Sequence, residues 1–352
     1  MKEHTPNYHH IVDAALNRTP RRLPVYEHII APEKMEEILG RKFVTLYQGD
    51  AADQREFFRE FNGFFKRMGY DTVSFEGCVV DVVAQGQALS GHTPGAISTR
   101  ADFEKYPFDE LPDRYWVLHD QHFQQLGEEM PEGMKAIGGI GNGVFEIAQD
   151  LAGYTGLCMM RVDDPLLYAD LFAKVGDLMV ALWKRLLERH GDTYAVCRFG
   201  DDLGFKSSTL LSPTEIRAHI LPQYKRIVDI VHAAGKPFLL HSCGCIFEVM
   251  EDIIKCVGID AKHSNEDQIA PFRVWVERYG SRIGNFGGVD MDVLCRQKES
   301  EIKKYVLNVI HDSVGHGGIA IGSGNSIPDY VPAAGYLAML ETVWDYRASA
   351  VP

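Results

Sequence analysis

Short apolar runs alternate with amphipathic stretches along the whole chain. Eight of these runs have the length, and the flanking glycine, proline or polar residues, that are typical of buried strands. They lie around residues 25, 73, 137, 196, 239, 260, 285 and 320. The stretches between them place apolar side chains at three- and four-residue spacing, which predicts helices.

Local signals indicate where several of the helices begin and end. Pro32 starts a helical pattern that Gly40 ends, and Ser212-Pro213-Thr214-Glu215 combines an N-cap serine, a proline at the next position and a capping-box glutamate. Phenylalanines recur at helical spacing over residues 53–68, and we interpret that stripe as core packing. The irregular segment over residues 77–99, rich in glycine and valine, is a candidate hairpin over a pocket.

Strands and helices that alternate eight times predict a single (β/α)8 barrel of the TIM type, because that fold needs eight parallel strands, each followed by a helix. The chain of 352 residues is longer than the ~250 typical of this fold, and we assign the excess to extra N-terminal helices and loops. No linker-like stretch divides it, so residues 1–352 are expected to form one domain. The alternative, a doubly wound open sheet, would concentrate its polar residues at one switch point.

Composition restricts the partners and the location. The formal net charge of -13 repels phosphate, so neither nucleic acid nor an anionic membrane surface is expected as the main partner. No stretch approaches the length of a membrane span, and the first 19 residues lack the apolar core of a signal peptide. We therefore expect a cytoplasmic protein, in which the seven scattered cysteines are reduced thiols rather than a disulfide framework.

The segment Lys236–Cys245 carries the strongest chemical signal. An apolar run ends abruptly in a histidine and two thiols, which predicts a buried strand that presents ligand-type side chains at its C-terminal end. His241 and Cys243 are two positions apart, so in an extended chain they leave the same face and can close on one metal ion. Imidazole with thiolate favours Zn²⁺. The alternatives are that both are ordinary core residues, and that Cys245 belongs to the next helix.

In a parallel barrel the C-terminal ends of all strands face one mouth. The polar side chains at the predicted ends are Glu27, Glu76, Asn142, Asp201, Asp202, His241, Cys243, His263, Asn265, Asp290 and Asn325. The adjacent carboxylates of Asp201 and Asp202 repel each other unless one pairs with a cation, a metal or a substrate proton, so both are candidate catalytic residues. A single polar residue such as Asp290 or Asn265 can instead cap the following helix.

The C-terminal half of the chain resembles the uroporphyrinogen decarboxylase superfamily, and within it the corrinoid-linked methyltransferases. The matching segments, in chain order, are Gly200–Gly204, Ser212-Pro213 through Leu221-Pro222, Gly235-Lys236-Pro237 through His241-Ser242-Cys243-Gly244, Gly287–Asp290 and Gly322–Pro328. The N-terminal half matches only in general layout. In the methyltransferase branch a His-x-Cys pair binds zinc, so the resemblance implies Zn²⁺ on His241 and Cys243.

One position departs from that pattern. Thiol-activating members have a further cysteine near the last strand, where this chain has Asn325. Loss of that thiolate leaves the metal more electrophilic and favours an oxygen ligand. Glu76 is the first choice for this ligand, with Cys245 or Asp202 in reserve, and an open fourth position suits catalysis.

The resemblance therefore implies a zinc-dependent methyltransferase. It would move a methyl group between a small methoxy, methylamine or thiol compound and a corrinoid carried on a separate partner protein. Asp201 or Asp202 would carry a proton or hold the substrate, and Tyr26, Asn142 and Asn325 are the expected substrate-binding residues.

Two other functions are open. The first is a metal-independent decarboxylase of the same superfamily, in which the acids and Arg198 handle a carboxylated substrate. The chain lacks that branch's arginine-rich N-terminal signature, and its acidic balance suits a multiply carboxylated tetrapyrrole poorly. The second is a barrel that binds a small molecule or a corrinoid protein without turnover.

Overall fold

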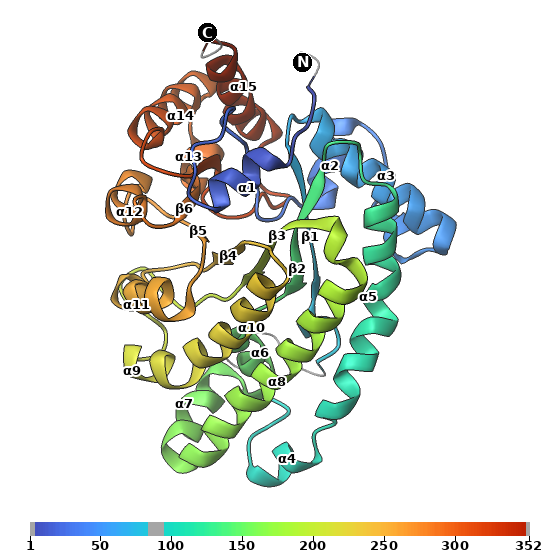
Figure 1. Ribbon diagram of the computed structural model, residues 1–352, viewed down its shortest axis with the longest axis vertical. Coiled ribbons are helices and arrows are strands. Elements are labelled where there is room, and N and C mark those ends of the chain that lie inside the picture. The colour runs from blue at the N-terminus through green and yellow to red at the C-terminus, as the bar shows by residue number, and fades with distance from the viewer. Residues whose placement is uncertain (1–3, 84–94, 350–352) are drawn as a thin grey trace.

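One curled sheet of seven parallel strands, in sequential order, forms the centre of the protein (Figure 1). The computed structural model describes residues 4–83 and 95–349, so the central part of the predicted hairpin over residues 77–99 lies outside the described residues. The strands are β1 (Thr72–Cys78), β2 (Lys135–Gly141), β3 (Tyr194–Gly200), β4 (Phe238–His241), β5 (Ala261–His263), β6 (Gly284–Val289) and β7 (Ile319–Ser323).

Helices surround the sheet and supply the crossovers that parallel pairing requires (Figure 1). They are α1 (His9–Ala15), α2 (Pro32–Leu39), α3 (Ala51–Arg67), α4 (Arg100–Lys105), α5 (Leu111–Glu128), α6 (Val144–Ala152), α7 (Tyr154–Asp163), α8 (Pro165–His190), α9 (Pro213–Glu215), α10 (Leu221–Ala233), α11 (Phe247–Asp252), α12 (Phe272–Tyr279), α13 (Met291–Arg296), α14 (Glu299–Ser313) and α15 (Ala333–Ser349). Short 3₁₀ or π turns are η1 (Val44–Gln48), η2 (Val79–Asp81), η3 (Phe108–Glu110), η4 (Gly191–Thr193), η5 (Ile216–Ile220) and η6 (Ile253–Val257).

The predicted helix starts and stops are confirmed at several points. α2 begins at Pro32, and Gly40 ends it in the left-handed region at φ +65°. Ser212 caps α9 by accepting a hydrogen bond from the Glu215 backbone N–H at 3.2 Å. The phenylalanine stripe of α3 is buried, as expected for core packing.

The segment around residue 25 does not form the eighth strand that the sequence predicts. Val25 and Ile30 make only isolated parallel bridges, one to β7 and one to the chain just beyond it. Pro24 has no N–H to contribute to a ladder. On this side the curled sheet is continued by an extended segment that is paired at single points.

On its other side, the same segment faces β1 through side chains rather than a backbone ladder. The carbonyl of His28 accepts hydrogen bonds from the side chains of Ser74 and Arg198. These side chains take the place of the backbone N–H groups that a neighbouring strand would offer. The architecture is therefore TIM-like but not closed, and we call the boundary between residues 24–30 and β1 the seam.

α1 covers the N-terminal end of the curled sheet. Three of its side chains pack with apolar residues inside the sheet: the cluster comprises Ile11, Ala14, Ala15, Tyr26, Ile137, Ala195, Val196, Leu239, Ala261, Phe286 and Ala320. A Cβ added at Gly284 or Gly318 would lie 2.3 Å or 1.9 Å from the Ala14 carbonyl oxygen, so glycine at these strand starts lets α1 approach. The polar strand ends lie at the opposite end.

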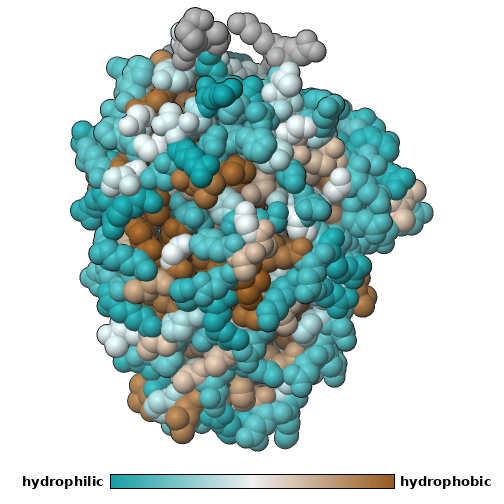
Figure 2. Space-filling model, in the orientation of Figure 1, coloured by the Kyte–Doolittle hydropathy of each residue, from teal (hydrophilic) through white to brown (hydrophobic). Residues whose placement is uncertain are grey.

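The outer surface is mostly polar. Figure 2 shows a largely hydrophilic face on which apolar residues gather toward the centre. None of the helices within the described ranges combines the length and the apolar character that crossing a bilayer requires.

Candidate functional site

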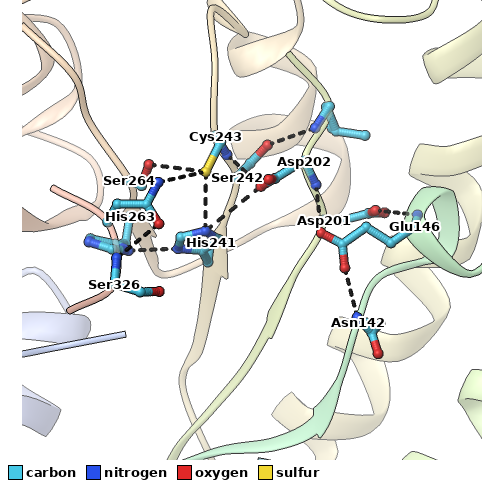
Figure 3. Close-up of polar contacts among 12 residues, drawn as sticks. Asn142, Glu146, Asp201, Asp202, His241, Ser242, Cys243, His263, Ser264 and Ser326 are labelled. Carbon is cyan, nitrogen blue, oxygen red and sulfur yellow. Dashed lines mark hydrogen bonds and ion pairs between the residues drawn. The ribbon is translucent and has the colours of Figure 1, made fainter. Parts of the chain in front are cut away.

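Three potential metal ligands converge where β3 and β4 end. Asp202, His241 and Cys243 place their ligand atoms within 4.8 Å of one another (Figure 3). The Nε2 atom of His241 lies 3.4 Å from the Cys243 sulfur and 3.8 Å from Asp202 Oδ1. The backbone N–H of Cys243 donates to the same Asp202 oxygen at 3.0 Å. The Asp202 side chain is 35% exposed, so the group is open to solvent on that side.

The register of the sheet explains this convergence. Gly200, the last residue of β3, pairs directly with His241, the last residue of β4. The residues that follow each strand therefore leave the sheet at the same level. The sequence prediction that strand ends meet at one mouth is confirmed for these two strands.

The ring of His263, at the end of β5, fixes the position of the proton on His241. Burial lowers the pKa of His263 to about 3 and holds the pKa of His241 well below its ordinary value, so both rings are neutral at pH 7. His263 Nε2 lies 3.0 Å from the carbonyl oxygen of Ser323, which can only accept, so Nε2 carries the His263 proton. The bare Nδ1 of His263 then accepts from Nδ1–H of His241 at 2.7 Å.

This relay leaves the second nitrogen of His241 unprotonated. A neutral imidazole has one protonated nitrogen, and the proton of His241 is on Nδ1. Its Nε2 lone pair therefore points toward Cys243 and Asp202, the two residues to which dashed lines run from this side of the ring in Figure 3. Metal-bound histidines commonly have this arrangement, in which the non-ligating nitrogen donates to a fixed acceptor.

The sulfur of Cys243 lies among hydrogen-bond donors. Asn325 Nδ2 donates to it at 3.3 Å and Ser264 Oγ at 3.6 Å. Burial, followed by the charge of Asp202, raises the pKa of the Cys243 thiol well above its ordinary range. The thiol therefore stays protonated unless a cation stabilises the thiolate.

The donor set fits a zinc ion. Zn²⁺ binds imidazole nitrogen, thiolate sulfur and carboxylate oxygen, and catalytic sites use three protein ligands with one position left open. Asp202, His241 and Cys243 supply one donor of each kind. Cys245 lies outside this group, and its backbone N–H donates to the Phe205 carbonyl at 2.7 Å.

His28 adds a second ring beside His241. The two rings are stacked with centroids 3.6 Å apart and planes 8° apart, and Nδ1 of His28 is buried without a hydrogen-bond partner. His28, His241 and His263 form a second group of three potential ligands. The sequence analysis placed His263 at a strand end, but it gave no signal that the rings of His28 and His263 would both meet His241.

Asp201 points to a helix rather than to the ligand group. Its two carboxylate oxygens accept from the backbone N–H groups of Phe145 and Glu146, at 2.9 Å and 2.8 Å, at the start of α6. Tyr224 donates its hydroxyl to the same carboxylate. Burial raises the pKa of Asp201 to about 7. The contacts describe a helix cap, and the predicted catalytic role of Asp201 stays a prediction.

Glu146 is an acid of this region that the sequence analysis did not single out. It accepts from the Asp202 backbone N–H at 3.3 Å and from Asn142 Nδ2 at 3.0 Å. Burial and the neighbouring Asp201 raise the pKa of Glu146 well above its ordinary value. Asn142 also accepts from the backbone N–H of Val80 at 3.3 Å, so its amide is held by the protein on both sides. Its predicted contact with substrate stays a prediction.

Glu76 belongs to neither group of potential ligands and instead pairs with Arg198. Arg198 Nη2 and Nε lie 2.6 Å and 3.2 Å from Glu76 Oε2. Nη1 of Arg198 donates to the Tyr26 hydroxyl, Ser74 Oγ and the His28 carbonyl at 3.0, 2.7 and 2.8 Å. All three nitrogens of this fully buried guanidinium are therefore engaged. Tyr26, predicted to bind substrate, lies in the same buried network.

Two cavities adjoin these residues. One of about 260 Å³ is lined by Asn325, Asp290 and Tyr330, among others, and so reaches a side chain that contacts Cys243. The other, of about 420 Å³, lies at the seam and is lined in part by Glu76 and Arg198. Both have sizes suited to small molecules or parts of them.

Comparisons with known proteins agree on the fold. The sequence pattern of the uroporphyrinogen decarboxylase (URO-D) family matches residues 65–346. No curated protein matches the chain. Among solved structures, a methyltransferase from Methanosarcina mazei is similar with a TM-score of 0.74 at 15% identity, over 96% of this chain and 98% of that one.

Two further structures share the fold more distantly. A putative vitamin B12-independent methionine synthase from Listeria monocytogenes has a TM-score of 0.53 at 11% identity, over 94% of this chain and 100% of that one. A B12-independent methionine synthase from Shewanella sp. W3-18-1 has a TM-score of 0.51 at 11% identity, over 85% of this chain and 89% of that one.

Proposed function

The chain belongs to the uroporphyrinogen decarboxylase family, and on that basis we propose that it is a zinc-dependent methyltransferase. It would move a methyl group between a small methoxy, methylamine or thiol compound and a corrinoid carried on a partner protein. The observation that carries this proposal is the convergence of Asp202, His241 and Cys243, with the lone pair of His241 Nε2 directed at the other two. A decarboxylase that works without a metal has no need of such a donor set.

We assign the three protein ligands to His241, Cys243 and Asp202. Asp202 replaces Glu76 as the proposed oxygen ligand, because Glu76 is held by Arg198. Zn²⁺ bound there would supply Lewis acidity toward the heteroatom that carries the methyl group. The solvent-exposed side of Asp202 would leave the fourth position reachable by a substrate.

The surrounding residues would prepare this site. His263 keeps the proton of His241 on Nδ1, so that Nε2 is ready to bind. Asn325 and Ser264 donate to the Cys243 sulfur and favour its thiolate form. Asn325 thus has a function at the position where thiol-activating relatives carry a cysteine, and its amide also borders the smaller cavity.

The corrinoid partner needs a test separate from that of the metal. Of the three structures named above, one is described as a methyltransferase, one as a vitamin B12-independent methionine synthase and one as a putative enzyme of that kind. The shared fold therefore does not choose between a corrinoid and another methyl carrier. Our preference for the corrinoid rests on the resemblance of the segments around Asp202 and His241.

The hydrogen bonds of Arg198 are evidence against the decarboxylase alternative. A carboxylated substrate would need a free cationic group, and Arg198 already donates from all three nitrogens to Glu76, Tyr26, Ser74 and His28. The metal-independent reaction would therefore need other residues to bind the carboxylate.

The first experiment is to measure the zinc content of the purified protein and of single variants. We expect about one zinc per chain in the wild type, as in other catalytic sites of this ligand type, and none in His241→Ala or Cys243→Ala. Cys245→Ala is the matched control, because it removes a nearby thiol that lies outside the ligand group, and it should keep the metal. Asp202→Asn should bind zinc more weakly than Glu76→Gln if the oxygen ligand is assigned correctly.

Methyl transfer is then assayed with the zinc-loaded protein. Reduced cobalamin is mixed with methoxy or methylamine compounds, and methylcobalamin with thiols, and the absorbance of the cobalt centre is followed. Transfer that is lost in Cys243→Ala but kept in Cys245→Ala would support the proposal. A wild type that takes up no zinc even after reconstitution would refute it.

A further inference from the structure

The cavity of about 420 Å³ at the seam lies at the edge of the sheet that β1 forms. Its lining includes three consecutive residues of β1: Ser74, Phe75 and Glu76. Successive side chains of a strand point to opposite faces, so one cavity can touch all three only where the sheet ends. The cavity therefore occupies the boundary where a complete eighth strand would have paired with β1.

The outer part of the cavity has aromatic walls. Tyr47, Phe57 and Phe61 line it, with ring centroids 4.9 Å apart for the first two and 5.5 Å for the last two. Ile29, which is 40% exposed, lies at its rim. Flat aromatic walls and an apolar rim suit a ring-sized apolar ligand, and the volume lies in the usual range of small-molecule sites, about 300–1,000 Å³.

The inner part of the cavity ends at a buried ion pair. Arg198 has no free nitrogen, whereas Glu76 uses only Oε2 for Arg198, and its Oε1 accepts no hydrogen bond from the described residues. The inner end thus offers a hydrogen-bond acceptor to a ligand. Because the charges of Glu76 and Arg198 already compensate each other, a charged ligand would enter without a counterion of its own, and a carboxylate would be repelled by Glu76.

The cavity and the proposed zinc site lie on two sides of one residue. The carbonyl of His28 accepts from Arg198, which lines the cavity, and the ring of His28 stacks on His241 at 3.6 Å. A ligand that reaches the inner end of the cavity therefore lies close to the residues that support the zinc ligands.

We propose that the seam cavity binds a small uncharged phenol whose hydroxyl donates to Glu76 Oε1 and whose ring lies between the aromatic walls. Its role as methyl donor rests on the proposed function: a phenol that also carries a methoxy group beside its hydroxyl, and so near the inner end of the cavity, would be the substrate. In that reaction the bond between the methyl carbon and the ether oxygen breaks, and the oxygen keeps its electron pair and takes up a proton to give a second hydroxyl. The methyl group passes to the reduced Co(I) centre of the corrinoid, which supplies the electron pair of the new cobalt–carbon bond and is thereby oxidised to Co(III).

The test is binding of 2-methoxyphenol, measured by calorimetry on the full chain, with benzoate as the anionic comparison. Ile29→Trp should fill the cavity from its exposed rim and weaken binding at least about tenfold, or 1.4 kcal/mol. Leu166→Trp is the matched control, because Leu166 is 75% exposed and lies on α8, outside the cavity lining. It should bind like the wild type, and benzoate should not bind.

Equal binding by Ile29→Trp and the wild type, or benzoate binding as tight as that of 2-methoxyphenol, would overturn the proposal. Glu76→Gln is a second probe of the polar contact, but it also removes the partner of a buried arginine, so Ile29→Trp carries the test. The same titration with Cys243→Ala separates the two proposals. Phenol binding that persists in this variant supports the cavity assignment whatever the zinc measurement gives.

Discussion

His263 controls which nitrogen of His241 is free, and replacing it should weaken metal binding. The change is His263→Leu, which removes the acceptor 2.7 Å from His241 Nδ1. His241 is 4% exposed, so its Nδ1–H would lose its partner without gaining water. A buried donor left without a partner costs about 1–3 kcal/mol. The ring can avoid this cost by moving its proton to Nε2, which then no longer binds a metal.

Either route should lower zinc affinity by about 10- to 100-fold, the usual effect of removing a residue that orients a metal ligand. At about 1.4 kcal/mol per tenfold change, this amounts to about 1.4–2.8 kcal/mol of binding free energy. The assay is competition for zinc with a chelator of known affinity at pH 7.

The conservative control is His263→Asn, because the side-chain oxygen of asparagine reaches about the position of the histidine Nδ1 and can accept the same hydrogen bond. It should recover most of the lost affinity, whereas a general packing defect would affect both variants. Unfolding of both by urea gives the packing contribution separately. The reasoning is refuted if His263→Leu binds zinc as tightly as the wild type, or if leucine and asparagine have the same effect.

Three further predictions concern the stability of the fold. Glu76→Gln leaves a buried arginine without its carboxylate and should lower the free energy of unfolding by about 3–5 kcal/mol. Lys225→Ala removes one partner of an exposed ion pair and should change the free energy of unfolding by less than about 1 kcal/mol. Urea titrations of the two variants test both values. Burial raises the pKa of Glu27 to about 8 from an ordinary 4.5, so the unfolded chain releases this proton at lower pH than the folded one. The wild type should therefore lose stability as the pH rises between these values, and Glu27→Gln should flatten that loss in unfolding curves across the window. An unchanged slope would show that Glu27 is not the cause. Gly143→Ala would place a Cβ 2.1 Å from the Cβ of Asp201 and should displace the side chain that caps α6. We expect a lower melting temperature for this variant, and an unchanged melting temperature would contradict the prediction.

The sequence was sufficient to predict the alternation of strands and helices, seven of the strands and the proximity of His241 to Cys243. The last follows from local geometry alone, since residues two positions apart in an extended chain leave the same face. Asp202 came within reach because strand ends meet at one level, a property of parallel barrels in general.

Other features depend on contacts between distant segments, which no local pattern encodes. Glu76 and Asp202 are both acids near strand ends, and only the three-dimensional arrangement of β1, β2 and β3 shows that Arg198 holds one and leaves the other beside His241. The residues around 25 have the same apolar pattern as a strand. Their failure to pair with β1 depends on side chains of Ser74 and Arg198, which satisfy the carbonyl of His28.

The strict sequential order of the strands has a consequence for how the chain reaches its final state. Each of the seven strands finds its neighbour in the next part of the chain, which favours rapid, stepwise growth of the sheet from β1 to β7. Residues 17–30 also need partners from the far end of the chain: the Gly318 N–H donates to Asn17 across 301 positions, and the Ser323 N–H donates to Glu27 across 296. The stretch of chain between these partners is longer than that between any two neighbouring strands of the sheet, so we expect these contacts to form after the strand pairs. A ribosome completes residues 17–30 long before their partners exist, and this arm would then be the last part of the barrel to fold.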